Sequence, residues 1–170
     1  MRIIFLSEFW TIILCFMVWL VLQVSSALIC LNLPDRFFAP ESFIFRTHHF
    51  ERQGRIYNQL FRISRWKHLL PDGAVVWKKR GYKKKKLIDF SDENLNRFLI
   101  ESAQGELSHW LTLFPFWLFW FFTPPLVPWI MLVYAIGVNV PCIMAQRYNR
   151  PRVQHLLDRK QRVVKNGNGR

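Results

Sequence analysis

Two long stretches without any charged residue limit the folds that are open to this sequence. No Lys, Arg, Asp or Glu occurs between Phe9 and Leu33, and none occurs from Leu107 to Gln146. A helix of about 20 apolar residues is enough to cross a hydrocarbon core of about 30 Å. Both stretches are therefore long enough to form membrane-spanning helices.

The first stretch predicts a retained membrane anchor over residues 1–33. As a helix, Phe9 to Leu31 would be about 34 Å long at about 1.5 Å per residue. The alternative is a cleaved signal peptide, because Ser25 and Ala27 offer the small residues of a cleavage site. We favour the anchor, since only Arg2 precedes the run as a positive charge and apolar residues continue to its end.

The second stretch predicts a helical hairpin over residues 107–146. Its first arm, Leu107 to Phe122, would reach only about 24 Å before prolines impose a turn. Its second arm, Leu126 to Ala145, would reach about 30 Å and return the chain to the side where it began. The hairpin either spans the membrane or re-enters one leaflet, and its tryptophans suit the interface.

Positive charge is concentrated on either side of this hairpin. Residues 34–106 hold 15 Lys and Arg against nine Asp and Glu, and residues 147–170 hold eight against one. Because the hairpin begins and ends on one side, both segments should face one compartment, which the positive-inside rule makes the cytoplasm. We attribute the formal charge of +13 to attraction to anionic lipids, so membrane lipids are expected partners and nucleic acid is not.

The predicted fold class is therefore all-α, an integral membrane protein of four segments. An N-terminal anchor (1–33) leads to a basic interfacial region (34–106), a transmembrane or re-entrant hairpin (107–146) and a basic tail helix (147–170).

Three shorter patterns predict where helices begin. Alternating apolar and basic residues predict an amphipathic interfacial helix over Phe50–Ile63. Ser91, followed by acidic residues, predicts the start of one long helix that continues into the hairpin. In the tail, Asn149 as a cap and Pro151 in the first turn predict a separate helix over Arg152–Lys165.

His68 and Asp72 form the first candidate for catalysis. A histidine followed four residues later by an acid occurs in unrelated acyltransferases, where the imidazole removes the proton of an attacking hydroxyl. Pro71-Asp72-Gly73 is also an ordinary turn sequence, which leaves a purely structural interpretation open.

Glu101, Glu106 and His109 form the second candidate, at the point where the long helix becomes apolar. At about 100° per residue the three share one broad face. A carboxylate one turn from an imidazole can orient it and raise its basicity, and ionisable groups at such a depth tend to be functional. The alternative is a structural polar network. No metal site is expected, because a second Glu-x-x-His copy is missing.

A third candidate is the basic tract around Lys83, which runs from Lys78 to Lys86. It could hold the phosphates of coenzyme A, although a polybasic segment near a membrane more often binds anionic lipid. The three cysteines form no CxxC pair, so neither a disulfide framework nor a metal site is indicated.

Several strings of this sequence resemble one family of enzymes. The strings are Arg65-Trp66-Lys67-His68 with Asp72-Gly73, Glu106-Leu107 with His109-Trp110, Asn139-Val140-Pro141, and Gln146-Arg147-Tyr148-Asn149-Arg150-Pro151-Arg152. Together they are similar to the glycosyl-4,4'-diaponeurosporenoate acyltransferases of staphyloxanthin-type carotenoid biosynthesis in bacteria. The similarity covers nearly the whole chain. Gln104 departs from it, standing where the family motif has a basic residue.

The resemblance implies transfer of a fatty acyl chain to the glucose 6-hydroxyl of a glycosylated C30 carotenoid acid, in the bacterial cell membrane. The expected partners are this acceptor and a fatty acyl donor, with acyl-CoA favoured and no bound cofactor. The catalytic candidates remain His109 with Glu106, or His68 with Asp72. The candidates for substrate binding are Glu101, Arg147, Asn149, Arg150 and Lys83, the basic ones neutralising donor phosphates.

Two other functions remain open from the sequence alone. The chain could be a non-catalytic membrane scaffold for the pathway, since it carries no strong catalytic signature. It could also be an acyltransferase that modifies another glycolipid.

Overall fold

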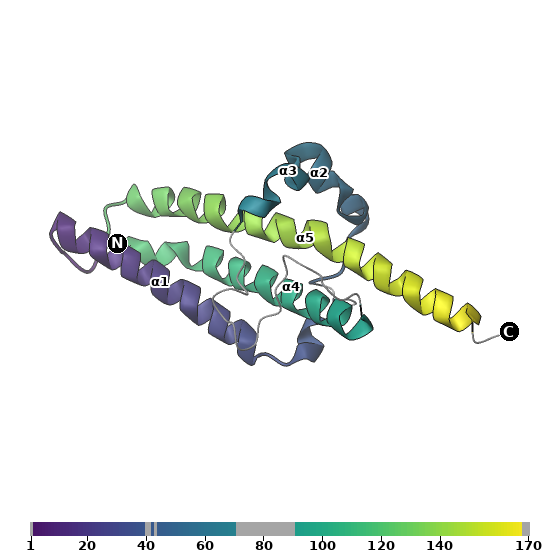
Figure 1. Ribbon diagram of the computed structural model, residues 1–170. Coiled ribbons are helices and arrows are strands. Elements are labelled where there is room, and N and C mark those ends of the chain that lie inside the picture. Colours follow the sequence, from purple (N-terminus) through teal and green to yellow (C-terminus); the bar gives the residue numbers. More distant parts are fainter. Residues whose placement is uncertain (1, 40–41, 43, 71–90, 168–170) are drawn as a thin grey trace. The chain divides into compact units, whose positions relative to one another are not determined.

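Every regular element in the part of the chain that the structure describes is helical. This structure is a computed structural model, and it describes residues 2–39, 42, 44–70 and 91–167 (Figure 1). In chain order the elements are α1 (Glu8–Asn32), η1 (Asp35–Phe38), η2 (His49–Gly54), α2 (Arg55–Phe61), α3 (Ile63–Trp66), η3 (Lys67–Leu69), α4 (Asp92–Leu113), η5 (Phe114–Phe121) and α5 (Val127–Gly167), where η marks a 3₁₀ helix. The predicted all-helical class is confirmed.

The chain divides into two compact units, which are described separately. The first unit comprises Met1–Leu33 and Glu106–Ile143, and the second comprises Pro34–Gly105 and Met144–Arg170. The chain passes from the second unit to the first within α4, between Gly105 and Glu106. It returns to the second unit within α5, between Ile143 and Met144.

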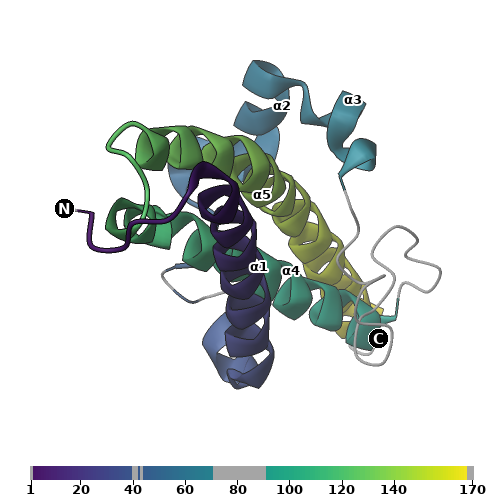
Figure 2. The same cartoon turned by 90° about the vertical axis from the view of Figure 1, so that its left-hand side faces the viewer.

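The first unit brings α1 beside η5 and the first turns of α5 (Figures 1 and 2). Its small core consists of Cys15, Phe119 and Phe122, packed against Trp19 and Met131 among others. The Trp19 indole donates to the Met131 sulfur at 3.4 Å. The N-terminal backbone is fixed as well, because the amides of residues 3 and 4 donate to the Phe121 carbonyl.

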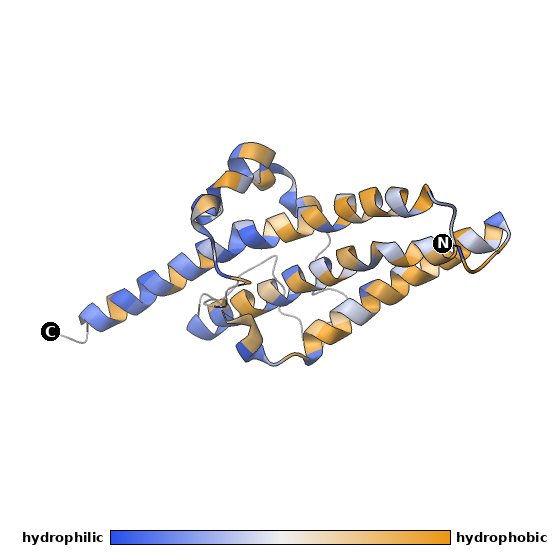
Figure 3. Cartoon of the chain, turned by 180° about the vertical axis from the view of Figure 1, so that it is seen from behind, coloured by the Kyte–Doolittle hydropathy of each residue, from blue (hydrophilic) through white to orange (hydrophobic). Residues whose placement is uncertain are grey.

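Two helices of the described residues are long and apolar enough to cross a membrane, namely α1 and α5. Figure 3 shows α1 and the first turns of α5 as mostly apolar, whereas the last turns of α5 are mostly hydrophilic. In the most apolar window of α1 only 11% of the residues are buried within the protein. A helix in the core of a soluble protein would instead be mostly buried.

The predicted helix start at Ser91 is confirmed. The Asn94 amide donates to the Ser91 hydroxyl at 3.3 Å, and the Leu95 amide donates to the Ser91 carbonyl at 3.0 Å. The acidic side chains of Asp92 and Glu93 occupy the first turn, where they favour the positive end of the helix dipole. From this cap α4 runs without a break to Leu113, two residues before Pro115.

The predicted separate tail helix is wrong, because α5 continues through Pro151 without interruption. A proline has no N–H, so it removes the helical donor of one carbonyl, that of Arg147. The loss is local, and the Arg152 guanidinium donates to the neighbouring Tyr148 carbonyl at 2.6 Å. Gly54 lies so close to this turn that a Cβ there would be 3.0 Å from the Tyr148 carbonyl oxygen.

The predicted amphipathic helix over Phe50–Ile63 is also wrong, because the chain breaks it into shorter pieces. Arg52, Gln53, Gly54 and Arg62 all have positive φ, so η2, α2 and α3 follow one another with sharp changes of direction. Such left-handed residues cannot continue a right-handed helix. Gly54 adopts this conformation without the strain that a side chain would bring.

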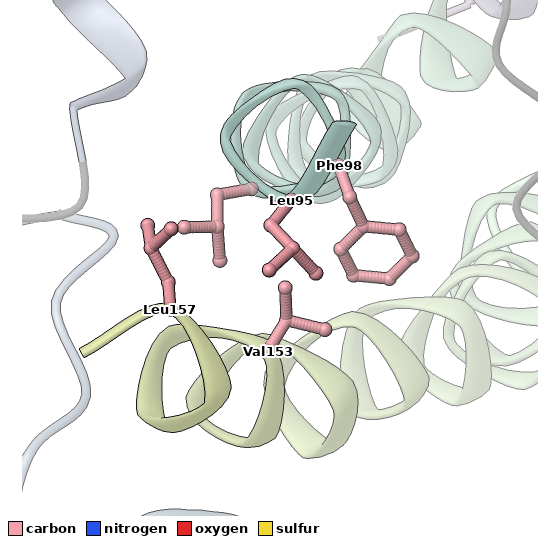
Figure 4. Packing of buried hydrophobic residues seen from close by; sticks show 5 residues of the cluster. Leu95, Phe98, Val153 and Leu157 are labelled. Carbon is pink, nitrogen blue, oxygen red and sulfur yellow. The ribbon is translucent and has the colours of Figure 1, made fainter. Parts of the chain in front are cut away.

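The second unit has its own apolar core between the start of α4 and the tail of α5 (Figure 4). Leu95, Phe98 and Leu99 of α4 pack against Val153 and Leu157 of α5, and all five side chains are buried. Their spacing of three and four residues places each group on one face of its helix. This contact holds the tail of α5 to the capped end of α4.

We expect Leu157→Ala to lower the free energy of unfolding by about 2–5 kcal/mol, because it leaves a cavity in this core. Leu156→Ala is the matched control, with the same substitution on the neighbouring residue. Leu157 is 4% exposed and Leu156 is 42% exposed, so the control should cost less than about 1 kcal/mol. Equal losses in denaturant unfolding of the purified protein would contradict this packing.

Candidate active site

Glu106 and His109 lie one helical turn apart near the end of α4, in the first unit. The Glu106 carboxylate is 0% exposed. The Trp110 indole donates to its Oε1 at 3.4 Å, at the long end of a hydrogen bond. A buried carboxylate beside an imidazole can stabilise the imidazolium that forms when the ring takes up a proton.

The ring of His109 is held by Asn139 of α5, which belongs to the same unit. His109 Nδ1 lies 2.9 Å from Asn139 Oδ1. The Asn139 amide nitrogen donates to the Ala135 carbonyl at 2.9 Å, and Asn139 is only 1% exposed. A carbonyl accepts only, so the amide must present its oxygen, not its nitrogen, to the histidine.

This orientation determines which nitrogen of His109 carries the proton. Because Asn139 Oδ1 can only accept a hydrogen bond, Nδ1 must be the protonated nitrogen. In the neutral imidazole the lone pair then lies on Nε2. The arrangement prepares Nε2 to act as a general base.

Asn139 was not among the catalytic or substrate-binding candidates, although it lies in one of the strings that carried the family resemblance. A polar amide in a long uncharged run was the available signal, since polar side chains in such a helix tend to be functional. Its partner lies 30 residues earlier in the chain, a pairing that no local periodicity indicates.

A cleft of about 340 Å³ lies between α1 and α5 in the first unit. The residues that line it are Phe16, Met17, Trp19, Leu20 and Gln23 of α1, and Tyr134, Val138 and Asn139 of α5. Most of this wall is apolar, and its polar groups include Asn139. One residue therefore both lines the cleft and holds the His109 ring.

Glu101 lies in the second unit and pairs with Arg97, whose Nε is 3.1 Å from the carboxylate. Glu101 and the pair of Glu106 and His109 therefore belong to different units. The predicted role of Glu101 in binding substrate stays a prediction.

Arg147 joins a buried carboxylate in the second unit. Its Nη1 lies 2.7 Å from Oε1 of Glu51, which is 1% exposed, and its Nη2 donates to the Ile44 carbonyl at 3.0 Å. The Tyr57 hydroxyl donates to the other Glu51 oxygen at 3.1 Å. Burial, followed by the negative charge of Glu51, raises the pKa of Tyr57 to about 12.

Arg150 and Asn149 also contact other parts of the second unit. Arg150 is buried and donates to the carbonyls of Phe45 and Ser102 at 3.0 and 3.2 Å. Asn149 Oδ1 accepts from the Lys67 ammonium at 2.8 Å. Their predicted contacts with substrate, like those of Arg147, stay predictions.

The other sequence candidate, His68, is exposed in η3, and its partner Asp72 lies outside the described residues, as does Lys83. Within the described ranges no group of three His, Cys, Asp or Glu side chains could hold a metal ion. Of the two predicted catalytic pairs, only Glu106 and His109 lie wholly within the described residues.

Comparison with known proteins identifies the family. The family model of CrtO, glycosyl-4,4'-diaponeurosporenoate acyltransferase, matches residues 40–159. The chain belongs to this family. Glycosyl-4,4'-diaponeurosporenoate acyltransferases of Staphylococcus aureus strains bovine RF122 / ET3-1 and USA300 are each 35% identical to it over 147 residues, which cover 86% of this chain and 88% of the relative. No solved structure matches the chain.

The resemblance of the sequence strings is thereby confirmed, and the protein is an acyltransferase. The matched range of the family model includes both Glu106 and His109 on α4 and Asn139 on α5. The same range includes the other candidate pair, His68 and Asp72, so the family match does not choose between the two histidines.

Nitrogen NMR of the acyltransferase labelled at histidine should show the neutral ring of His109 as the Nδ1–H tautomer. Asn139→Ala removes the oxygen that accepts from Nδ1, so this preference should weaken. Asn149→Ala, an asparagine replacement on the same helix but in the other unit, is the control and should leave the His109 spectrum unchanged. A wild-type signal from the Nε2–H tautomer would contradict the proposed orientation.

Proposed function

We propose that this protein transfers a fatty acyl chain to the glucose 6-hydroxyl of glycosyl-4,4'-diaponeurosporenoate, in staphyloxanthin-type carotenoid biosynthesis. The support comes from the family and from the substrate in its relatives' names. The observation that carries the chemistry is the contact of the half-buried His109 with the buried Asn139, which prepares a base in an apolar unit.

We place the protein in the bacterial cell membrane as a multi-pass protein. The support is the set of large apolar side chains exposed along α1 and the first part of α5, Phe9, Phe16 and Val133 among them. Such a surface costs free energy in water and is favourable in hydrocarbon. The basic segments, 34–106 and 147–170, would then face the cytoplasm.

The reaction needs one proton carrier. As the glucose hydroxyl attacks the acyl carbonyl, its proton moves to Nε2 of His109 and a tetrahedral intermediate forms. Collapse of the intermediate breaks the bond to the donor's leaving group, which takes the proton from His109. With an acyl-CoA donor the products are the sugar ester and free coenzyme A thiol. Glu106, one turn away, would stabilise the imidazolium between the two steps.

His109→Ala should lower kcat by about 10²- to 10⁴-fold, the usual contribution of a general base. The assay uses purified protein in detergent with glycosyl-4,4'-diaponeurosporenoate and acyl-CoA, and mass spectrometry of the ester. His155→Ala, an exposed histidine of the tail, is the matched control and should keep full activity.

His68→Ala decides between the two histidines of the sequence analysis. If His68→Ala loses activity and His109→Ala keeps full activity, the general base is His68. Turnover by the purified wild type excludes a pure scaffold. If the purified protein esterifies another glycolipid but not the glycosylated carotenoid, the proposed acceptor is wrong.

We further propose that the cleft between α1 and α5 holds the hydrocarbon chain of the acyl donor. Its volume of about 340 Å³ lies near the lower end of ligand sites, which suits one flexible chain better than the long rigid polyene. A chain lying along Leu20 and Val138 would bring its carbonyl end toward Asn139. Burial of each methylene stabilises the complex by about 0.8 kcal/mol.

Val138→Trp should therefore shift the product toward shorter acyl chains, because the indole fills the cleft. Val133→Trp is the control, the same substitution on the same helix at a residue that is 71% exposed and does not line the cleft. The measurement is mass spectrometry of esters formed from an equimolar mixture of acyl-CoA chain lengths. An unchanged chain-length profile in an active Val138→Trp enzyme would exclude this cleft as the chain site.

A further inference from the structure

Two cationic side chains approach the same aromatic ring in the second unit. The Lys67 ammonium lies 4.9 Å from the centre of the Tyr148 ring, and the Arg152 guanidinium carbon lies 3.5 Å from it. The ring itself is buried, with Tyr148 6% exposed. Each contact is a cation–π interaction, which stabilises a single cation but does not neutralise two.

No carboxylate of the described residues balances this pair of charges. Lys67 donates to the Asn149 side-chain oxygen and Arg152 donates to the Tyr148 carbonyl, and both acceptors are neutral. Partial burial lowers the pKa of Lys67, and the nearby charge of Arg152 lowers it further. A bound anion would remove this repulsion and replace the water that burial has taken away.

Three other basic side chains of the second unit have different partners from those of Lys67 and Arg152. Arg147 lies against the buried Glu51, Arg150 donates to two backbone carbonyls, and Lys160 lies 2.6 Å from Asp92. Arg147 and Lys160 share their charge with carboxylates, and the buried Arg150 uses two backbone carbonyls where the exposed Arg152 uses one. Compared with Arg147, Arg150 and Lys160, the pair of Lys67 and Arg152 is better placed to attract an added anion.

The donors of the pair match a phosphate group. An ammonium supplies up to three N–H donors and a guanidinium up to five. Lys67 uses one donor in its bond to Asn149, and Arg152 uses one in its bond to the Tyr148 carbonyl. Charge-assisted bonds from such groups to phosphate oxygens are about twice as strong as bonds between neutral groups. A carboxylate of a fatty acid would use fewer of these donors.

We propose that Lys67 and Arg152, held around Tyr148 by Asn149 and the α5 backbone, form a binding site for a phosphate group. The phosphate comes from the coenzyme A part of the acyl donor or from a phospholipid head group. The coenzyme A source rests on the proposed function, whereas the phospholipid source does not.

The test compares two double variants of the full-length protein in a neutral detergent. Lys67→Gln/Arg152→Gln removes both charges but keeps a hydrogen-bond donor at each position. Arg159→Gln/Arg162→Gln removes the same charge from exposed residues of α5 and is the matched control. Lys67→Arg/Arg152→Lys keeps the charge and shows whether the local fold tolerates substitution, with circular dichroism as the check on folding.

The first arm measures binding of coenzyme A, with pantetheine as the ligand without phosphate, by isothermal titration calorimetry. The second arm measures binding of phosphatidylglycerol against phosphatidylcholine by native mass spectrometry. Neither arm needs acyl transfer, so a failure of the proposed reaction would not be confused with a failure of this site.

The Lys67→Gln/Arg152→Gln protein should bind the true phosphate ligand, coenzyme A or phosphatidylglycerol, at least about tenfold more weakly than wild type. The basis is a loss of about fivefold in affinity for each charge removed. The control and the charge-conserving variant should stay within about threefold of wild type. A loss for coenzyme A alone assigns the donor, and a loss for phosphatidylglycerol alone assigns the lipid. Equal losses in the control, or no loss in either arm, would overturn the site.

Discussion

The buried ion pair between Glu51 and Arg147 is the contact on which the arrangement of the second unit depends. A carboxylate that is 1% exposed must find donors inside the protein, and Glu51 accepts from Arg147, from Tyr57 and from its own turn at His48. Removing one partner of such a pair leaves an uncompensated buried charge, which is strongly destabilising. Because Glu51 precedes α2 and Arg147 lies on α5, the pair fixes an irregular segment against a helix.

The first unit buries few polar side chains, and two of them are the carboxylate and the amide near His109. Its described surface is largely apolar, yet Glu106 and Asn139 are both fully buried within it. Unpaired polar groups in such surroundings cost several kcal/mol, so each must be satisfied by a specific partner. The need for a hydrogen-bond partner also orients Asn139. Because its amide nitrogen donates to a backbone carbonyl, its oxygen faces His109.

Features with a local cause could be predicted from the sequence, and features with a distant partner could not. The start of α4 followed from Ser91 and the acids after it, since a cap depends only on neighbouring residues. The sequence predicts a separate tail helix because Pro151 suits a first helical turn, whereas the core that Leu157 forms with α4 stabilises a helix that continues through this proline. The oxygen that holds His109 and the carboxylate that meets Arg147 lie 30 and 96 residues away, which composition and periodicity do not reveal.

In the proposed reaction, the amide of Asn139 would serve His109 in both of its protonation states. An imidazolium keeps the hydrogen on Nδ1 that the neutral ring already had, so the same oxygen accepts the same bond before and after the ring is charged. A catalyst that exchanges protons through its far nitrogen can thus pass between both states without rotating a side chain. In water, solvent molecules would have to reorient when the ring becomes charged. Here folding has already oriented the oxygen that bonds to it.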